Sequence, residues 1–449
     1  MIAPSEAEDR CADLVARARR AGADGASAHV SAESSLAVDV RLGALEDVSR
    51  SESEELALTV HVGRRKASVR SSDFAPAALE ELAARAVDMA RASPEDPYAG
   101  PAPADLLARV WPADLDLADL DLADGAEPGP ETLRERALEC EDAARAVAGI
   151  TNSNGAGGSF QRSTFALATS EGFAGSYEGT LHSISASMIA GEGSAMQRNH
   201  DYRVARHAGD LPDPAGIGAS ASERTVRKLD PQVPKGGTMP VVFDSRVGSS
   251  LVGHILGAIG GPAHARRATF MLDRMQDAVF APGIVLREEP HRPRGLRSSP
   301  FDGEGLPRVA RSLVVGGYAT GLVTNLASAR QLQTTPSGNG AAGGGISVGN
   351  LHIEAGEETR EAMIADIADG IYVTELIGQG VNMVTGTYSR GAAGYRIAGG
   401  EIAGPLAEFT IAGNLVDMFG TLRAANDLAF DHVTNVPSLR VDGMVVAGA

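Results

Sequence analysis

Three residues whose side chains can do chemistry lie within six positions of one another: Ser249, Ser250 and His254. A serine near a histidine is half of a catalytic triad, and histidine is also a common zinc ligand. The surrounding sequence completes neither kind of site. No Gly-x-Ser-x-Gly motif and no acidic partner accompany the serines, and the C-terminal half has no cysteine to join His254 in a metal site. We therefore interpret His254 as a packing or cleft residue.

The segment that must position these residues is predicted to be a buried strand followed by a helix. The apolar run 241–243 is typical of a short buried strand, and the helix begins near Arg246. Apolar side chains recur on one face of the helix at Leu251, Ile255, Ala258 and Ile259. Because His254 lies three positions after Leu251, it shares this apolar face.

Polar side chains are interleaved with glycines in the segment 372–395. They are Glu375, Asn382, Thr385, Tyr388, Ser389 and Arg390. Glycine lets two backbones approach closely, and fixed polar groups beside it can hold a peptide main chain. The same composition is also typical of structural turns. The residues alone leave both interpretations open, a peptide-binding cleft and a set of turns.

A Gly-x-Gly-x-x-Gly pattern occurs at Gly338, Gly340 and Gly343. A dinucleotide-binding fingerprint must follow a strand and open a helix. This pattern instead follows Thr-Thr-Pro-Ser at 334–337 and precedes a β-like run at 346–348. It fails both tests, so we interpret it as a flexible loop. A loop of this length in a sheet-rich region is expected to border a cleft.

The order of the predicted elements indicates an α+β fold, with helices segregated from antiparallel sheets. We predict an N-terminal α+β domain over 1–100, an acidic, proline-rich connector over 101–130, a middle α+β domain over 131–235 and a β-rich C-terminal domain over 236–449. The acidic run in the connector lacks the glycine and the distal glutamate of a calcium-binding loop, so we expect a solvated linker.

Helical periodicity predicts helices over 5–21, 76–91, 131–149 and 214–228. Leu42 is expected to end a strand, Gly63 to mark a hairpin, and residues 152–158 to form a turn-rich break. Three dipeptides in the C-terminal domain predict two-residue hairpin turns: Gly316-Gly317, Gly399-Gly400 and Asp442-Gly443.

Composition limits the classes of function. The chain has 449 residues, is 43% hydrophobic and 22% charged, and carries a formal net charge of −18. So negative a protein is a poor ligand for a phosphate backbone, which argues against nucleic-acid binding. The two cysteines, Cys11 and Cys140, do not suggest a disulfide framework. We see no signal peptide and no long apolar span, so we expect a cytoplasmic protein without a membrane partner.

Several long motifs in the same order resemble the TldD/PmbA family, also called the "modulator of DNA gyrase" family. They are 168–179, 280–283, 300–305, 373–382, 386–394 and 410–419. The resemblance covers nearly the whole chain and is weakest near 93–130. Within the family the chain looks like the PmbA, or TldE, type of subunit. The TldD type of subunit carries a His-Glu-x-x-x-His motif and a later cysteine, which hold a catalytic metal.

The resemblance places Ser249 at the first motif histidine, Ser250 at the glutamate and His254 at the second histidine. Where the other subunit has its cysteine, this chain reads Asp-His-Val-Thr-Asn-Val over 431–436. The resemblance therefore implies that these are degenerate metal-motif positions, and that this chain has no catalytic residue and no metal of its own. Zinc is expected in a TldD-type partner, which would use it to hydrolyse peptide bonds.

The resemblance thus implies a non-metal-binding subunit of a heteromeric metallopeptidase that acts on small or unfolded peptides. Peptidase activity is then expected only in the presence of the partner. A different class of function stays open, a catalytically inactive peptide-binding protein that forms a homodimer or larger homo-oligomer. Direct action on DNA is disfavoured by the net charge of −18.

Overall fold

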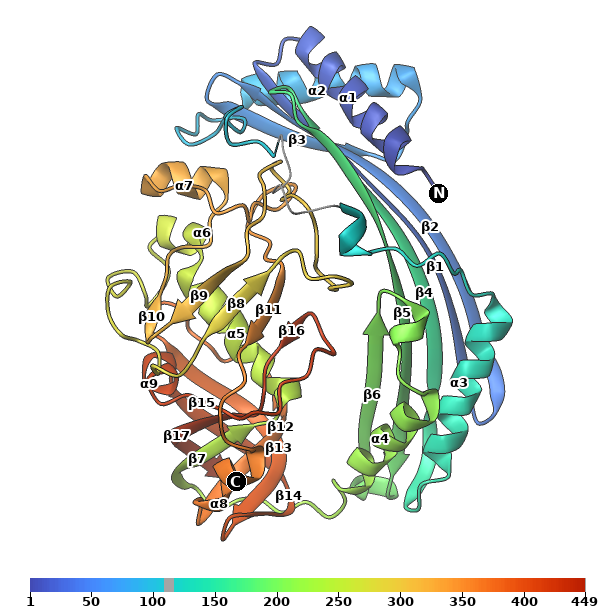
Figure 1. Ribbon diagram of the computed structural model, residues 1–449, viewed down its shortest axis with the longest axis vertical. Coiled ribbons are helices and arrows are strands. Elements are labelled where there is room, and N and C mark those ends of the chain that lie inside the picture. Colours follow the sequence, from blue (N-terminus) through green and yellow to red (C-terminus); the bar gives the residue numbers. More distant parts are fainter. Residues whose placement is uncertain (109–116, 449) are drawn as a thin grey trace.

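Six strands form one antiparallel sheet in the order β3-β2-β1-β4-β5-β6. The computed structural model describes residues 1–108 and 117–448. In Figure 1 the sheet curves around one side of the C-terminal half. Its strands are β1 (Gly25–Arg41), β2 (Ala44–Val62), β3 (Arg65–Ser71), β4 (Ile150–Thr169), β5 (Ala174–Ala190) and β6 (Gln197–Ala205).

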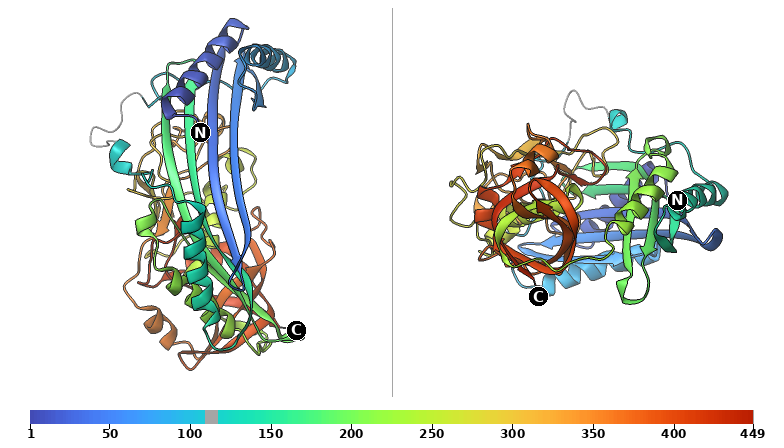
Figure 2. Two further views of the ribbon diagram at one scale, coloured as in Figure 1. Left: turned by 90° about the vertical axis from the view of Figure 1, so that its right-hand side faces the viewer. Right: turned by 90° about the horizontal axis from the view of Figure 1, so that it is seen from below.

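Four helices pack on the face of this sheet that points away from the C-terminal half (Figures 1 and 2). They are α1 (Pro4–Arg20), α2 (Pro76–Ala92), α3 (Pro130–Arg145) and α4 (Pro214–Val226). Each has proline in its first turn, where the missing N–H costs no hydrogen bond. Alternate strand residues fill the space beneath them, with Ala28 and Val30 in one cluster and Ala186 and Met188 in another. These helices confirm the periodicity predictions.

Residues 152–158 were expected to form a turn-rich break, and this prediction is wrong. They belong to β4, which pairs with β1 from Ser27 opposite Thr169 to Val40 opposite Ala156. The glycines and polar residues are accommodated by a register irregularity against β5 between Ser153 and Ala156. Strands from the regions 1–100 and 131–235 therefore share one sheet.

The connector differs from the solvated linker that was expected. Leu107, Leu120 and Leu122 are buried, and Asp121 pairs with Arg294 at 2.5 Å. Residues 109–116, which include the start of the acidic run, lie outside the described residues. The short 3₁₀ helices are η1 (Leu117–Leu120), η2 (Gly193–Ala195) and η3 (Ala208–Asp210). Leucines that alternate with aspartates anchor this segment, so its acidic composition alone was a misleading guide.

The C-terminal half is built around a sheet in the order β14-β13-β12-β7-β17-β15. Its strands are β7 (Gly237–Phe243), β12 (Asp369–Ile377), β13 (Thr387–Ala398), β14 (Glu401–Asn414), β15 (Arg423–Ala424) and β17 (Leu439–Gly448). An additional β14–β17 pairing closes this sheet into a barrel, which Figure 2 shows end-on. The β7–β12 pair is parallel and the other pairs are antiparallel.

A smaller sheet, β10-β9-β8-β11-β16, lies beside the barrel. Its strands are β8 (Leu286–Glu289), β9 (Arg311–Val315), β10 (Tyr318–Ala319), β11 (Asn350–Ile353) and β16 (Thr434–Asn435). The helices of this half are α5 (Ser245–Ile259), α6 (Gly261–Ala265), α7 (Leu326–Leu332), α8 (Arg360–Ala365) and α9 (Leu415–Gly420). Within the described ranges, no helix is both long and apolar enough to span a membrane.

The hairpin predictions hold at Gly63, Gly316-Gly317 and Gly399-Gly400, where each turn joins two paired strands. The prediction at Asp442-Gly443 is wrong. Both residues lie inside β17, at a register irregularity against β7 between Val441 and Met444. Gly443 uses its positive φ of 80° to form this irregularity rather than a turn. The α+β class and the sheet-rich C-terminal region agree with the sequence analysis.

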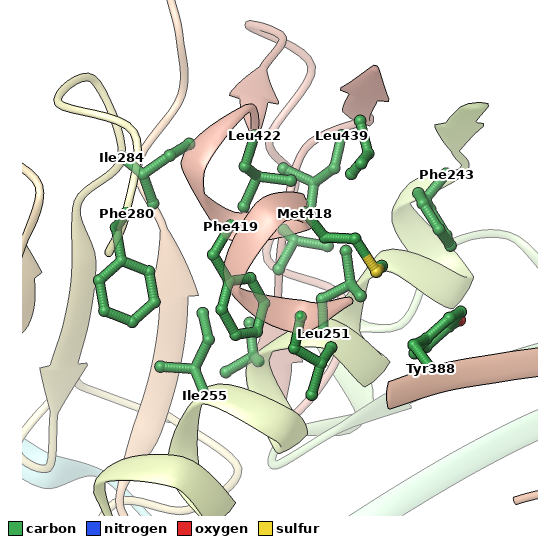
Figure 3. Packing of buried hydrophobic residues seen from close by; sticks show 14 of the residues in the cluster. Phe243, Leu251, Ile255, Phe280, Ile284, Tyr388, Met418, Phe419, Leu422 and Leu439 are labelled. Carbon is green, nitrogen blue, oxygen red and sulfur yellow. The ribbon is translucent and has the colours of Figure 1, made fainter. Parts of the chain in front are cut away.

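The main core lies between the barrel and α5. Figure 3 shows Leu251 and Ile255 of α5 beside Phe419 of α9 and Tyr388 of β13. Leu251 and Ile255 are fully buried, as their helical spacing predicted. Asp244 caps the helix by accepting a hydrogen bond from the Arg246 N–H at 3.0 Å. This packing fixes the position of α5, and with it the two serines and His254.

An Ile255→Val substitution is expected to lower the free energy of unfolding by about 0.5–1.5 kcal/mol, because it removes one fully buried methylene. Chemical denaturation of the full chain measures this change. Ile402→Val is the matched control, since Ile402 is 43% exposed and should change stability by less than about 0.5 kcal/mol. Equal effects at both positions would contradict the packing described for α5.

Candidate functional site

A cleft of about 720 Å³ separates β6 from the C-terminal half. We call it the β6 cleft. Figure 1 shows β6 on the side of the curved sheet that faces this half. The cleft is lined from β6 by Asn199, His200, Tyr202 and Val204, and from the C-terminal half by Arg246, Ser249, 374–377 and 431–434. Segments that are far apart in the sequence thus meet at one place.

A second cleft, of about 1010 Å³, continues along the concave face of the sheet. It shares Leu181, Leu296 and Arg297 with the β6 cleft, so the two form one groove. Its walls include Glu33 of β1 and the buried Arg308. A groove of this size is large enough for an extended peptide of several residues.

Ser249 lies in the wall of the β6 cleft, together with residues 431–434. The two places that the resemblance marked as degenerate metal positions are therefore brought together. The Ser249 hydroxyl donates a hydrogen bond to the Arg246 carbonyl at 3.4 Å, and the Ser250 hydroxyl donates one to the Val247 carbonyl at 2.7 Å. Each serine hydroxyl proton is therefore used in a hydrogen bond to the preceding turn of its own helix and is not shared with a general base.

His254 packs edge-on against the Tyr388 ring, with centroids 5.9 Å apart and an interplanar angle of 79°. Burial, followed by the nearby charge of Arg390, lowers the pKa of His254 below its ordinary value. Its Nε2 atom and the Tyr388 hydroxyl are both buried without a hydrogen-bond partner. The imidazole is therefore uncharged at neutral pH and makes a packing contact.

These residues do not fit a zinc ion. Zinc sites use three or four nitrogen, sulfur or carboxylate ligands. Ser249 and Ser250 offer hydroxyls that already bond to the helix backbone, and His254 faces an aromatic ring. Over residues 1–108 and 117–448, no three His, Cys, Asp or Glu side chains are grouped as a metal would require.

Only one of the six polar residues between 372 and 395 lines the β6 cleft. This residue is Glu375, which pairs with Lys228 of the segment after α4 at 2.6 Å. Asn382 instead accepts hydrogen bonds from the backbone of Val384 and Thr385, as in a structural turn. Tyr388 is buried in the core, Ser389 is exposed and Arg390 is half-buried, and none of these three is in the wall of the cleft.

An aromatic wall of the cleft was missed in the sequence. The rings of His200 and Tyr202 are stacked with centroids 6.3 Å apart, and Tyr202 lies 5.3 Å from the ring of His432. Burial lowers the pKa of both histidines, with Arg246 contributing at His200 and Arg203 at His432. The alternation of His200, Tyr202 and Val204 along one strand was the available signal. This wall offers uncharged, flat surfaces to a ligand.

The glycine-rich loop does border a pocket, as expected. A pocket of about 100 Å³, here the junction pocket, lies between the curved sheet and the C-terminal half. Gly343 and Gly344 line it with His61, Glu304 and Arg330. Gly340 touches Glu304 so closely that any Cβ there would lie 2.2 Å from the Glu304 Oε2 atom. The glycines therefore allow close packing here.

Comparison with known proteins gives consistent matches along the chain. Family models described as PmbA/TldA metallopeptidase match it over 28–90 for domain 1, 123–229 for the central domain and 236–448 for the C-terminal domain. "Metalloprotease PmbA" of Escherichia coli O157:H7 is 36% identical over 427 residues, covering 95% of this chain and 92% of the relative. A PmbA homologue of Haemophilus influenzae is 32% identical over 431 residues, covering 94% and 93%.

Solved structures share the fold. A proposed modulator of DNA gyrase from Bacteroides thetaiotaomicron superposes with a TM-score of 0.90 at 24% identity, covering 100% of both chains. TldE from Thermococcus kodakarensis superposes with a TM-score of 0.85 at 21% identity, covering 98% of this chain and 100% of that one. The family matches extend over both the curved sheet and the barrel. The chain therefore belongs to the PmbA/TldD family of metallopeptidases.

Proposed function

We propose that this chain is a non-catalytic, peptide-binding subunit of a cytoplasmic PmbA/TldD-type metallopeptidase. A TldD-type partner is proposed to hold the zinc and to cleave small or unfolded peptides. The observation that carries the proposal is the make-up of the β6 cleft. There Ser249 and residues 431–434 meet in a groove of peptide size, and the donor set is unsuited to a metal.

The edge of the curved sheet supports peptide binding. β6 is the last strand of the sheet and pairs with β5 along one side only. The main-chain N–H and C=O groups on the free side of an edge strand can pair with an extended peptide. Asn199, His200 and Tyr202 of this strand line the cleft, so the peptide would lie where the aromatic wall can contact its side chains. This chain would thus orient a substrate for the partner.

Purification from the native cell tests the proposal. A tagged full-length chain is expected to bring down a TldD-type partner, with zinc in proportion to that partner. The same chain purified alone, after treatment with a chelator, should contain no stoichiometric zinc and should leave unfolded peptides uncut. Adding the partner with its zinc should produce cleavage.

Two outcomes would change the interpretation. Peptide cleavage by the chelator-treated chain without any partner would overturn the non-catalytic role. Recovery of the chain alone, as a homo-oligomer that binds peptides but never associates with a TldD-type protein, would favour an independent peptide-binding protein. The Tyr202→Ala variant is the control for the β6 cleft. It should still associate with the partner but should bind peptides more weakly.

A further inference from the structure

A pocket rich in arginine opens beside the β6 cleft. Its volume is about 520 Å³, and it shares Asn199, Arg246 and Thr374 with that cleft. We call it the arginine pocket. A peptide lying in the cleft could therefore extend one of its groups into the pocket without leaving the β6 edge.

Four arginines line the pocket and come from three helical regions. Arg224 is on α4 and Arg227 is its C-cap residue, Arg246 lies in the first turn of α5, and Arg360 begins α8. Asp244 is the single acidic residue in the lining. On a chain whose formal net charge is −18, this concentration of positive charge is a local reversal of sign.

Nearby carboxylates leave much of this charge uncompensated. Asp244 is occupied, since it accepts from the Arg246 backbone N–H at 3.0 Å and from the Tyr372 hydroxyl at 2.7 Å. Asp201 lies 3.8 Å from Arg224 but is already bonded to Arg203 at 2.7 Å and to the Ser220 hydroxyl at 2.6 Å.

Two of the arginines have no acidic partner. In the part of the chain that the structure describes, neither Arg227 nor Arg246 has a carboxylate within 4.0 Å, whereas Arg360 pairs with Glu361. Among the described residues, the Arg246 side chain donates to the His200 carbonyl alone, at 3.2 Å. The Nη1 atom of Arg224 is buried without a hydrogen-bond partner. Arginines in a pocket wall that are not fully paired with carboxylates are suited to binding a planar anion.

We propose that the arginine pocket binds a carboxylate of the peptide held in the β6 cleft, so that the chain selects acidic peptides. This inference rests on the proposed peptide-binding function and names the substrate class. The carboxylate can come from an aspartate or glutamate side chain or from the C-terminus of the peptide. A guanidinium binds a carboxylate through two parallel hydrogen bonds, which a neutral amide cannot reproduce.

Four peptides of equal length, carrying an uncharged fluorophore, distinguish these sources. They combine one internal glutamate or glutamine with a C-terminal acid or amide. Fluorescence anisotropy with the full-length chain is expected to show about tenfold or tighter binding for a peptide with the recognised carboxylate than for the neutral one. The pair that shows the difference identifies the source.

Arg227→Gln is the test variant, because Arg227 is exposed and forms no ion pair in the described residues. It should remove most of the preference for acidic peptides and leave the affinity for the neutral peptide unchanged. Arg85→Gln, an exposed arginine on α2, is the control and should change neither.

The outcomes separate the two proposals. Equal binding of all four peptides, with no effect of Arg227→Gln, would overturn the carboxylate inference and leave peptide binding in place. If none of the four peptides binds, both the carboxylate inference and the proposed peptide-binding function are overturned. A loss of affinity for acidic and neutral peptides alike in Arg227→Gln would also contradict a role specific to the carboxylate.

Discussion

Replacing Glu141 with alanine is expected to lower the free energy of unfolding by about 3–5 kcal/mol, because it removes a buried carboxylate that accepts three hydrogen bonds. Glu141 of α3 is fully buried. Its two carboxylate oxygens accept from the backbone N–H of Leu42 at 2.7 Å and of Gly43 at 2.8 Å, and the Ser153 hydroxyl also donates to it. Chemical denaturation of the full chain measures this loss, from the unfolding transition of the part that contains the curved sheet.

The effect comes from the turn that Glu141 holds. Leu42 and Gly43 join β1 to β2 with φ values of 55° and 77°, and a left-handed leucine is a strained turn residue. Glu139→Ala is the matched control, since Glu139 is exposed on the same helix and should change stability by less than about 0.5 kcal/mol. A loss below about 1 kcal/mol for Glu141→Ala would show that the carboxylate does not secure the hairpin.

The same turn shows where sequence patterns fail. Leu42 continues the apolar alternation of Leu36, Val38 and Val40, so it was expected to end a strand. The structure makes it the first residue of a turn, because an acceptor 99 positions away on α3 satisfies the turn's N–H groups. Local periodicity placed the helices because their buried faces repeat along the chain. It could not place a turn whose stability depends on a distant side chain.

Long-range pairing limited the prediction of the architecture. β1 and β4 are joined along their length although more than a hundred residues separate them, and the pairing uses small alternating side chains such as Ala28 opposite Ala168. Nothing in either strand alone specifies that partner. The sequence analysis therefore treated the N-terminal and middle regions as separate domains and did not predict that they share one sheet.

The candidate site was only partly visible for the same reason. The resemblance marked Ser249 and residues 431–436, and the structure brings Ser249 together with residues 431–434 of that segment. Glu375, which was singled out for its glycine-rich surroundings, lines the β6 cleft. The arginine pocket combines Arg224, Arg246 and Arg360, which no motif links in the sequence. Charge that gathers from separate helices becomes apparent only when their packing is known.

The stability of the chain is expected to respond to pH through two groups of the junction pocket, in opposite directions. Burial lowers the pKa of His61 from 6.5 to about 4, with Lys66 and Arg330 adding to the effect. As pH falls from 6.5 toward 4, His61 therefore takes up a proton in the unfolded chain but stays uncharged in the folded chain. His61 should cost about 3 kcal/mol of stability over that interval.

Glu304 has the opposite sign. Burial, followed by the charge of Asp302, raises its pKa from 4.5 to about 7, although the N–H of Leu326, Arg330 and Lys66 oppose the shift. The folded chain keeps a proton that the unfolded chain has lost, so stability falls as pH rises from 4.5 to about 7. The loss should again be about 3 kcal/mol. In the unmodified protein the two dependences largely cancel.

Single variants uncover each dependence. Glu304→Gln should leave the His61 dependence, so that, relative to the unmodified protein, this variant gains stability as pH rises from 4 to 7. His61→Gln should leave the Glu304 dependence, so that, relative to the unmodified protein, this variant loses stability over the same interval. Denaturation of both variants at pH 4.5, 5.5, 7 and 8 measures the two slopes. If the slopes of the two variants differ from that of the unmodified protein in the same direction, the opposed titrations of His61 and Glu304 are contradicted.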